Sequence, residues 1–92
     1  MKTWEGLGEL KGADGSFYQG FTKNKKYNGR GRLTYTNGDV YQGDWVAGKP
    51  NGNGVLVQPS TGAMYDGAWV KGERHGQGRE TQGETTFVGE FV

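Results

Sequence analysis

The chain has 92 residues, no cysteine and a formal net charge of +1, which suits a single domain and excludes disulfides and thiolate metal sites. Glycine supplies 19 of the 92 residues and apolar residues only 32%, yet aromatic residues reach 13%. Flexible glycine-rich linkers rarely carry that many aromatic rings, so we expect a folded protein of short strands and glycine turns.

The N-terminal sequence lacks the apolar core of a signal peptide, and no stretch approaches a membrane span. We therefore expect a cytoplasmic protein. Charge is uneven, because residues 1–38 carry seven basic and three acidic residues, whereas residues 39–92 carry four basic and seven acidic residues. A solvated mixed surface accounts for this pattern. Attraction between the two ends, or an acidic partner at the basic end, is the sharper alternative.

Three motifs recur in step along the whole chain, which identifies a repeat protein. An aromatic-x-Gly motif starts at Tyr18, Tyr41, Tyr65 and Phe87, at intervals of 23, 24 and 22 residues. Gly-x-Gly occurs at Gly6/Gly8, Gly29/Gly31, Gly52/Gly54 and Gly76/Gly78, and a third glycine falls at Gly15, Gly38, Gly62 and Gly83. We divide the chain, as one domain, into a half repeat 1–17, repeats 18–40, 41–64 and 65–86, and a half repeat 87–92.

Each repeat is predicted to form a β-hairpin. Alternation from Tyr41 places Tyr41, Gly43 and Trp45 on one face and the residues between them on the other. A return strand is expected over 54–57, after a turn over 47–52 that is rich in Gly and Asn. The units join through turn sequences at 36–39 and 60–62. No segment has helical spacing, so the predicted fold is all-β, with about eight strands.

Glycine between two aromatic residues predicts a packing slot. A side chain at Gly43 would crowd Tyr41 and Trp45, which are its neighbours on the same face. We expect an aromatic ring from an adjacent strand to lie flat in this slot. Burial of large rings outweighs the intrinsic weakness of glycine in a strand.

These motifs resemble the MORN repeat (membrane occupation and recognition nexus). Residues 41–63 and 65–86 match it best, through Tyr-x-Gly-x-Trp, the later Gly-x-Gly and the final turn glycine. The resemblance implies an elongated, curved single sheet of stacked antiparallel β-hairpins, a solenoid that serves as a scaffold or attachment module. It implies no catalysis by the repeats themselves, and we expect no cofactor.

Several positions depart from the repeat pattern. Thr22 stands where the next two repeats have Trp45 and Trp69, and Lys25 stands where they have glycine. Glu80 replaces the leucine that Leu10, Leu33 and Leu56 supply in the other copies.

Nucleotide chemistry and catalysis are not indicated. Residues 43–50 superficially resemble a P-loop, but Pro50 occupies the position of the Mg²⁺-binding Ser or Thr and no helix is expected to follow. His75 is the only histidine and occupies a turn position that is asparagine in the sister repeats. The carboxylates are spread over outward positions, so we predict neither an enzyme nor a metal site.

The aromatic face is the predicted protein-binding surface. A single sheet of this size has nothing else to cover that face, so its rings either bury one another or meet a partner. We expect a protein or peptide to dock there or at the sheet edges, where unpaired strands also permit end-to-end self-association. The candidate residues are Tyr18, Tyr41, Trp45, Tyr65, Trp69, Phe87 and Phe91.

A basic segment supports an alternative, attachment to an anionic membrane surface. Five basic residues lie within ten positions that contain no acid, and each contributes about 1 kcal/mol near an anionic leaflet. A solvated turn is the plainer interpretation, because the other repeats lack this cluster. Nucleic acid binding is not expected at a net charge of +1. The candidate lipid-binding residues are Lys23, Lys25, Lys26, Arg30 and Arg32.

Overall fold

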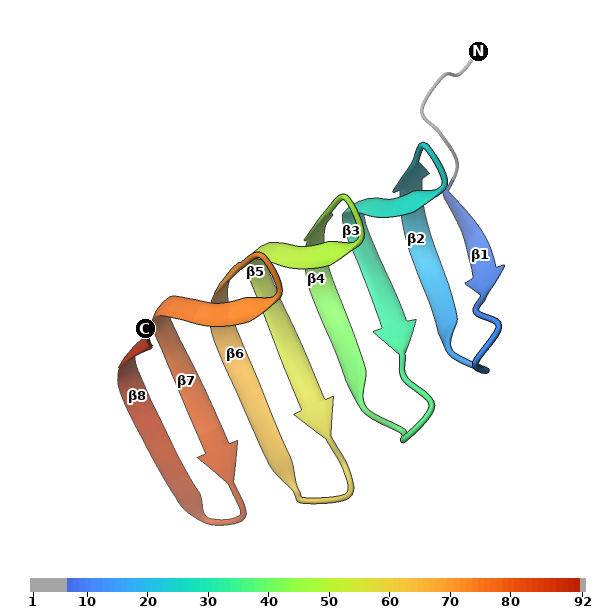
Figure 1. Ribbon diagram of the computed structural model, residues 1–92. Coiled ribbons are helices and arrows are strands. Elements are labelled where there is room, and N and C mark those ends of the chain that lie inside the picture. Colours follow the sequence, from blue (N-terminus) through green and yellow to red (C-terminus); the bar gives the residue numbers. More distant parts are fainter. Residues whose placement is uncertain (1–6, 92) are drawn as a thin grey trace.

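The computed structural model describes residues 7–91 as one open antiparallel sheet of eight strands, arranged in the order of the sequence (Figure 1). The strands are β1 (Leu7–Lys11), β2 (Phe17–Lys23), β3 (Lys26–Thr34), β4 (Val40–Val46), β5 (Lys49–Gln58), β6 (Ala63–Val70), β7 (Glu73–Gln82) and β8 (Thr85–Phe91). The predicted all-β, single-sheet fold is confirmed. Gly6 and Val92, which the repeat assignment included, lie outside the described residues.

The long hairpins β2–β3, β4–β5 and β6–β7 end in tight turns. Each has two turn residues with positive φ, as type I′ hairpin turns require. The second hairpin turns at Ala47 and Gly48, and β5 already starts at Lys49. The predicted turn over 47–52 was therefore too long, and the predicted start of the return strand at Gly54 lay too far along the chain. Pro50 and Gly52 can lie in β5 because the pairing register shifts beside them.

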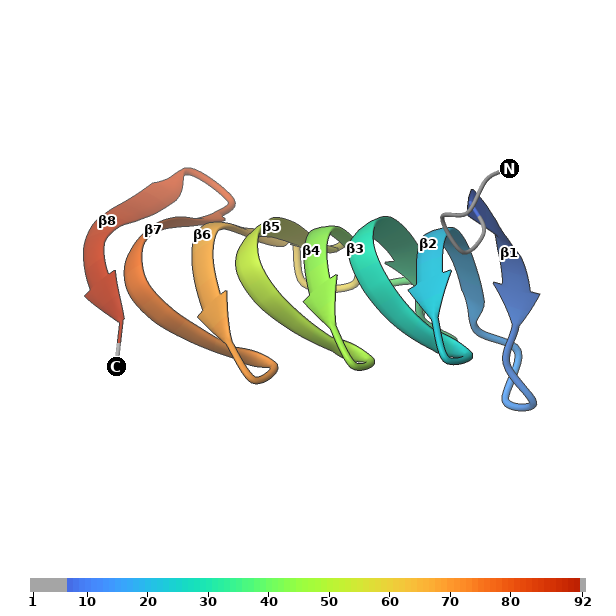
Figure 2. The ribbon, with the colours of Figure 1, turned by 90° about the horizontal axis from the view of Figure 1, so that it is seen from above.

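That register shift is a bulge that recurs in every long hairpin. In β4–β5, Gly43 pairs with Gly54 whereas Trp45 pairs with Pro50, so Asp44 faces the extra residues of β5. The Asp44 carboxylate accepts a hydrogen bond from the backbone N–H of Asn53 at 3.0 Å, which satisfies a donor that the ladder leaves free. The bulge bends each hairpin, and its tip curls over one face of the sheet (Figure 2).

Curled tips connect neighbouring repeats. The N–H of Gly48 donates to the carbonyl oxygen of Tyr27, and the N–H of Gly72 donates to that of Pro50, at 2.9 and 2.8 Å. These bonds hold each tip against the start of the preceding long strand. The described chain is consequently an elongated trough, with principal extents of 46 × 26 × 18 Å. We call the face under the tips the inner face.

A continuous row of glycines crosses all eight strands on this face. Each pairs with the next across the ladder, which joins the aromatic-x-Gly motif of one strand to the Gly-x-Gly motif of its neighbour. The row consists of Gly8, Gly20, Gly31, Gly43, Gly54, Gly67, Gly78 and Gly89.

Candidate functional site

Aromatic rings beside the glycine row form one continuous ladder. Consecutive rings meet edge-to-face, with centroids 4.8–5.8 Å apart and planes within about 10° of perpendicular, the arrangement that ring quadrupoles favour. The order is Tyr18, Trp45, Tyr41, Trp69, Tyr65, Phe91 and Phe87. The structure thus brings all seven candidate protein-binding residues together.

Each tyrosine is fixed by the glycines around it and by its own strand. A Cβ on Gly54 would overlap the phenol of Tyr41, and one on Gly43 would meet the β5 backbone and the same hydroxyl. The ring over Gly43 therefore comes from its own strand, whereas we expected a ring from an adjacent strand. The Tyr41 hydroxyl donates to the carbonyl of Asp44 at 3.0 Å. Burial, followed by the charge of Asp44, raises the pKa of Tyr41 to about 12.

Tryptophan joins one repeat to the previous one. Trp45 packs against Tyr41 of its own repeat and Tyr18 of the preceding repeat, and its indole N–H donates to the carbonyl of Gly31 at 3.0 Å. Thr22 occupies this position in the first hairpin, and β1, the one described strand before it, carries no tyrosine.

The departure at Glu80 coincides with an ion pair. Glu80 forms an ion pair with Arg74 at 2.9 Å, and the Arg74 guanidinium lies over the Tyr65 ring, 4.9 Å from its centroid. In the first repeat Tyr27 stands at the position of Arg74, and it stacks on Tyr18 with ring centroids 4.0 Å apart. An aromatic or cationic residue thus covers the tyrosine from the hairpin tip in these two repeats.

Burial divides the candidate protein-binding residues into two groups. Tyr18, Tyr41, Trp45, Tyr65 and Trp69 are at most 6% exposed, and together with Leu33 they form the core. Phe87 is 52% exposed, and Phe91 is partly buried. The accessible surface of the inner face is therefore supplied mainly by Phe87 and by the residues around the five buried rings.

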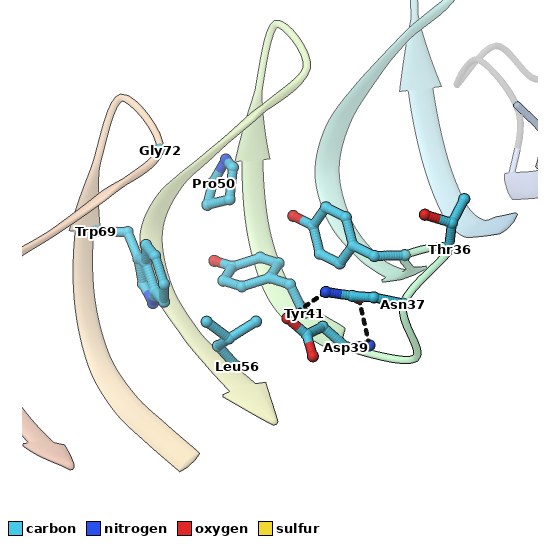
Figure 3. A pocket seen from close by; sticks show the side chains of 9 residues that line it. Thr36, Asn37, Asp39, Tyr41, Pro50, Leu56, Trp69 and Gly72 are labelled. Atoms are coloured by element: carbon cyan, nitrogen blue, oxygen red, sulfur yellow. Dashed lines mark hydrogen bonds between the residues drawn. The ribbon is translucent and has the colours of Figure 1, made fainter. Parts of the chain in front are cut away.

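Those surrounding residues frame a hollow of about 350 Å³ in the middle of the inner face (Figure 3). The loop that carries Thr36 and Asn37 forms one side, and the tips with Pro50 and Gly72 form the other. Tyr41, Leu56 and Trp69 lie between them. This hollow could not be predicted from the sequence, because it depends on how the tips curl; Tyr35, an aromatic residue outside the ladder, was the one sequence feature that pointed to it.

The hollow has a polar end at Asp39. One carboxylate oxygen accepts from Asn37 and Gln58 at 3.3 and 3.4 Å, and the other is buried with no hydrogen-bond partner among the described residues. Burial, followed by the Asp39 charge, raises the pKa of Tyr35 at the same end of the hollow. This end of the hollow therefore presents one carboxylate oxygen of Asp39 that has no donor among the described residues.

A related hollow occupies the preceding repeat. It measures about 330 Å³ and is framed by Gly12 on the loop side and Tyr27 and Gly48 on the tip side. These residues stand one repeat before Tyr35, Pro50 and Gly72. The lining of this hollow contains no acidic residue and includes Lys11, Lys25 and Lys26.

The basic cluster does not stay together. Lys23, Lys25 and Lys26 lie exposed at the β2–β3 tip, where Lys23 and Lys26 pair across the ladder. Arg30 forms an ion pair with Asp44 at 3.0 Å. Arg32 is exposed farther along β3, opposite Gln19 and Gln42. Three lysines therefore make the compact part of the cluster.

His75 and the carboxylates do not gather into a metal-binding cluster within the described residues. His75 is exposed and lies in β7, not in the turn where we placed it. No group of three or more His, Cys, Asp or Glu side chains within residues 7–91 could hold a metal ion. The P-loop look-alike lies across β4, the tip and β5. Over the same part of the chain, no helix has the length and apolarity to cross a membrane.

The repeats match a known protein family. Three consecutive stretches, residues 18–40, 41–62 and 65–83, match the family model of the MORN repeat. No curated protein matches the chain. MORN repeats are generally binding modules in protein or membrane interactions, and they are typically non-enzymatic.

Proposed function

The chain belongs to the MORN repeat family, and we propose that it is a non-catalytic scaffold whose inner face docks a segment of a partner protein. The observation that carries this proposal is the hollow between Thr36 and Pro50 (Figure 3). It is flanked by curled tips and lies above the buried rings of the core. A preformed concave site of this kind costs a ligand little reorganisation.

The distance between neighbouring hollows determines the spacing of the apolar side chains that a partner segment would place in them. Two strands per repeat, each about 4.8 Å from the next, place neighbouring hollows about 10 Å apart. Apolar side chains three residues apart on a polyproline II segment, or seven apart on an α-helix, match that spacing. The two hollows differ in charge, which would favour one direction of the bound segment. The lysines around Tyr27 favour an acidic residue in one hollow, and Asp39 favours a hydrogen-bond donor or a cation in the other.

Selection from a random-peptide display library tests the proposal. The expected binders carry apolar residues at one of these spacings. Thr36→Arg, which fills the rim of the central hollow, is expected to weaken them at least about tenfold, or about 1.4 kcal/mol. The matched control Gln77→Arg changes an exposed residue of β7. Equal losses in both variants, or no selected binder, would overturn the proposal.

A second candidate function is attachment to anionic membranes through the β2–β3 tip. It is supported by three exposed lysines, Lys23, Lys25 and Lys26, that have no carboxylate at ion-pair distance among the described residues. At about 1 kcal/mol each, they give weak, salt-sensitive affinity. The test is co-sedimentation with vesicles with and without phosphatidylserine. The double variant Lys25→Glu/Lys26→Glu should lose any preference for the anionic vesicles. Equal sedimentation of the wild type with the two kinds of vesicle would contradict this second function.

A further inference from the structure

The two outermost strands expose apolar side chains that the inner strands bury. Leu10 on β1 is 40% exposed, whereas Leu33, the same position one repeat later, is 6% exposed. At the other end Phe87 and Val88 on β8 are 52% and 63% exposed. The outer edges of β1 and β8 have no strand partner within residues 7–91. Both ends therefore combine free backbone groups with apolar surface.

The two edges are complementary halves of one repeat. Within β4–β5, Tyr41 pairs with Leu56 and Gly43 pairs with Gly54. β8 carries only the first half of this pattern, as Phe87 and Gly89, and β1 carries only the second half, as Gly8 and Leu10. An antiparallel pair with Gly89 opposite Gly8 of another copy would set Phe87 opposite Leu10. This register repeats the one that the sheet already uses.

Charge also favours the pairing of opposite ends. Residues 7–26 hold four lysines and two acids, and residues 73–91 hold two arginines and four glutamates. The first segment thus has a net charge of +2 and the second −2. Two like ends would repel each other, whereas opposite ends attract.

We infer that a second copy of this chain docks its β1 against β8, extending the sheet head-to-tail. The added pair, composed of β8 and the β1 of the second copy, would have the strand order and the register of the hairpin β4–β5. Because the contact joins two different surfaces, each copy keeps one free edge, and the assembly lengthens with concentration instead of stopping at a dimer. This inference is independent of the docking function of the inner face.

Gly8 offers a selective test. A Cβ on Gly8 would meet nothing within 4 Å in the single chain, whereas the equivalent Cβ on Gly54 would overlap the Tyr41 ring. In the docked pair the Phe87 ring of the other copy takes the place of Tyr41. Gly8→Val should therefore fold normally and yet close the β1 edge. Phe87→Lys should close the β8 edge, because it would set an unpaired charge against Leu10.

The experiment measures molar mass by light scattering over a range of protein and salt concentrations. Wild type should exceed twice its 10.0 kDa at high concentration and low salt. Gly8→Val and Phe87→Lys should each stay monomeric, whereas their equimolar mixture should form a heterodimer, because each variant retains the end that the other lacks. The control Gln77→Val should assemble like wild type.

Other outcomes overturn the inference. Wild type that is monomeric throughout excludes self-association. If only one variant loses assembly, like ends pair with each other, and if neither does, the contact lies elsewhere. Circular dichroism checks that each variant folds. Phe87→Ala, which removes the ring without adding charge, replaces Phe87→Lys if the lysine variant is unfolded.

Discussion

Gly52 and Gly54 stand two residues apart in β5 and are needed for different reasons. Gly52 has φ of 114° at the bulge, a conformation that other residues rarely adopt. Gly54 leaves room for the Tyr41 ring. Spacing alone revealed both glycines, but their separate reasons required the register and the direction in which Tyr41 leans.

Gly54→Ala is expected to lower the free energy of unfolding by about 1–3 kcal/mol, the usual cost of overpacking. The added methyl would displace a buried ring that is held by its hydroxyl bond to Asp44. Urea denaturation measures the loss. Gly8→Ala is the matched control and should be nearly neutral, because its Cβ meets nothing within 4 Å. Equal effects at the two positions would refute the ring-over-glycine account.

Lys25→Gly is expected to raise the free energy of unfolding by about 1 kcal/mol. Lys25 has φ of 65° at the β2–β3 tip, a left-handed conformation that costs an L-residue about 1–2 kcal/mol. The change would place a glycine directly after Asn24, and an Asn-Gly pair is a favoured type I′ turn sequence. Thermal and urea unfolding measure the gain. Lys26→Gly, in the adjoining strand, should instead destabilise, and a loss in both variants would contradict the turn assignment.

Alkaline pH should unfold the protein through its buried phenols. The folded-state pKa of Tyr41 is about 12, above its ordinary value of 10.0, so burial favours the neutral form. Its contribution to stability is fully present below pH 10 and is lost as the pH rises through about 12. Phenolate absorbance and unfolding should be followed together across this range. Titration of every tyrosine near pH 10 in the folded state would contradict the burial of Tyr41.

At the scale of the element, each hairpin is a unit that its tryptophan fastens to the preceding one. Trp45→Ala should cost about 3–5 kcal/mol, the usual range for a buried tryptophan, because it removes contacts with Tyr41 and Tyr18. Trp45→Phe should cost less, since it retains a ring and loses mainly the bond to Gly31. Thermal unfolding of both variants measures the difference. Equal losses would place the stabilisation in the indole N–H alone.

Much of each hairpin could be predicted from sequence. Alternation from Tyr41 to Trp45 identified the inner face, and the repeat period identified the single sheet. The start of β5 was misplaced because Pro50, Asn51 and Gly52 look like turn residues, whereas the bulge at Asp44 keeps them in a strand. The turn propensity of these residues does not predict a bulge, because a side chain on the partner strand stabilises it.

At the scale of the whole molecule, stacking converts repeated hairpins into a trough with two hollows of different charge. The hydrogen bonds from Gly48 to Tyr27 and from Gly72 to Pro50 join residues that are 21 and 22 positions apart in the sequence. No short sequence motif therefore predicts them. The rings of the ladder could therefore be predicted from the sequence, whereas the rim residues of the proposed docking site, such as Thr36, could not.

The most direct test of the proposed docking function is chemical-shift mapping of the full chain with a peptide selected against it. We expect the largest amide shifts at Tyr35, Thr36 and Gly72, around the central hollow, with small shifts at the outer-face residues Gln42 and Asp66. Shifts confined to the outer face, with the residues around the hollow unchanged, would contradict the assignment of the inner face as the binding surface.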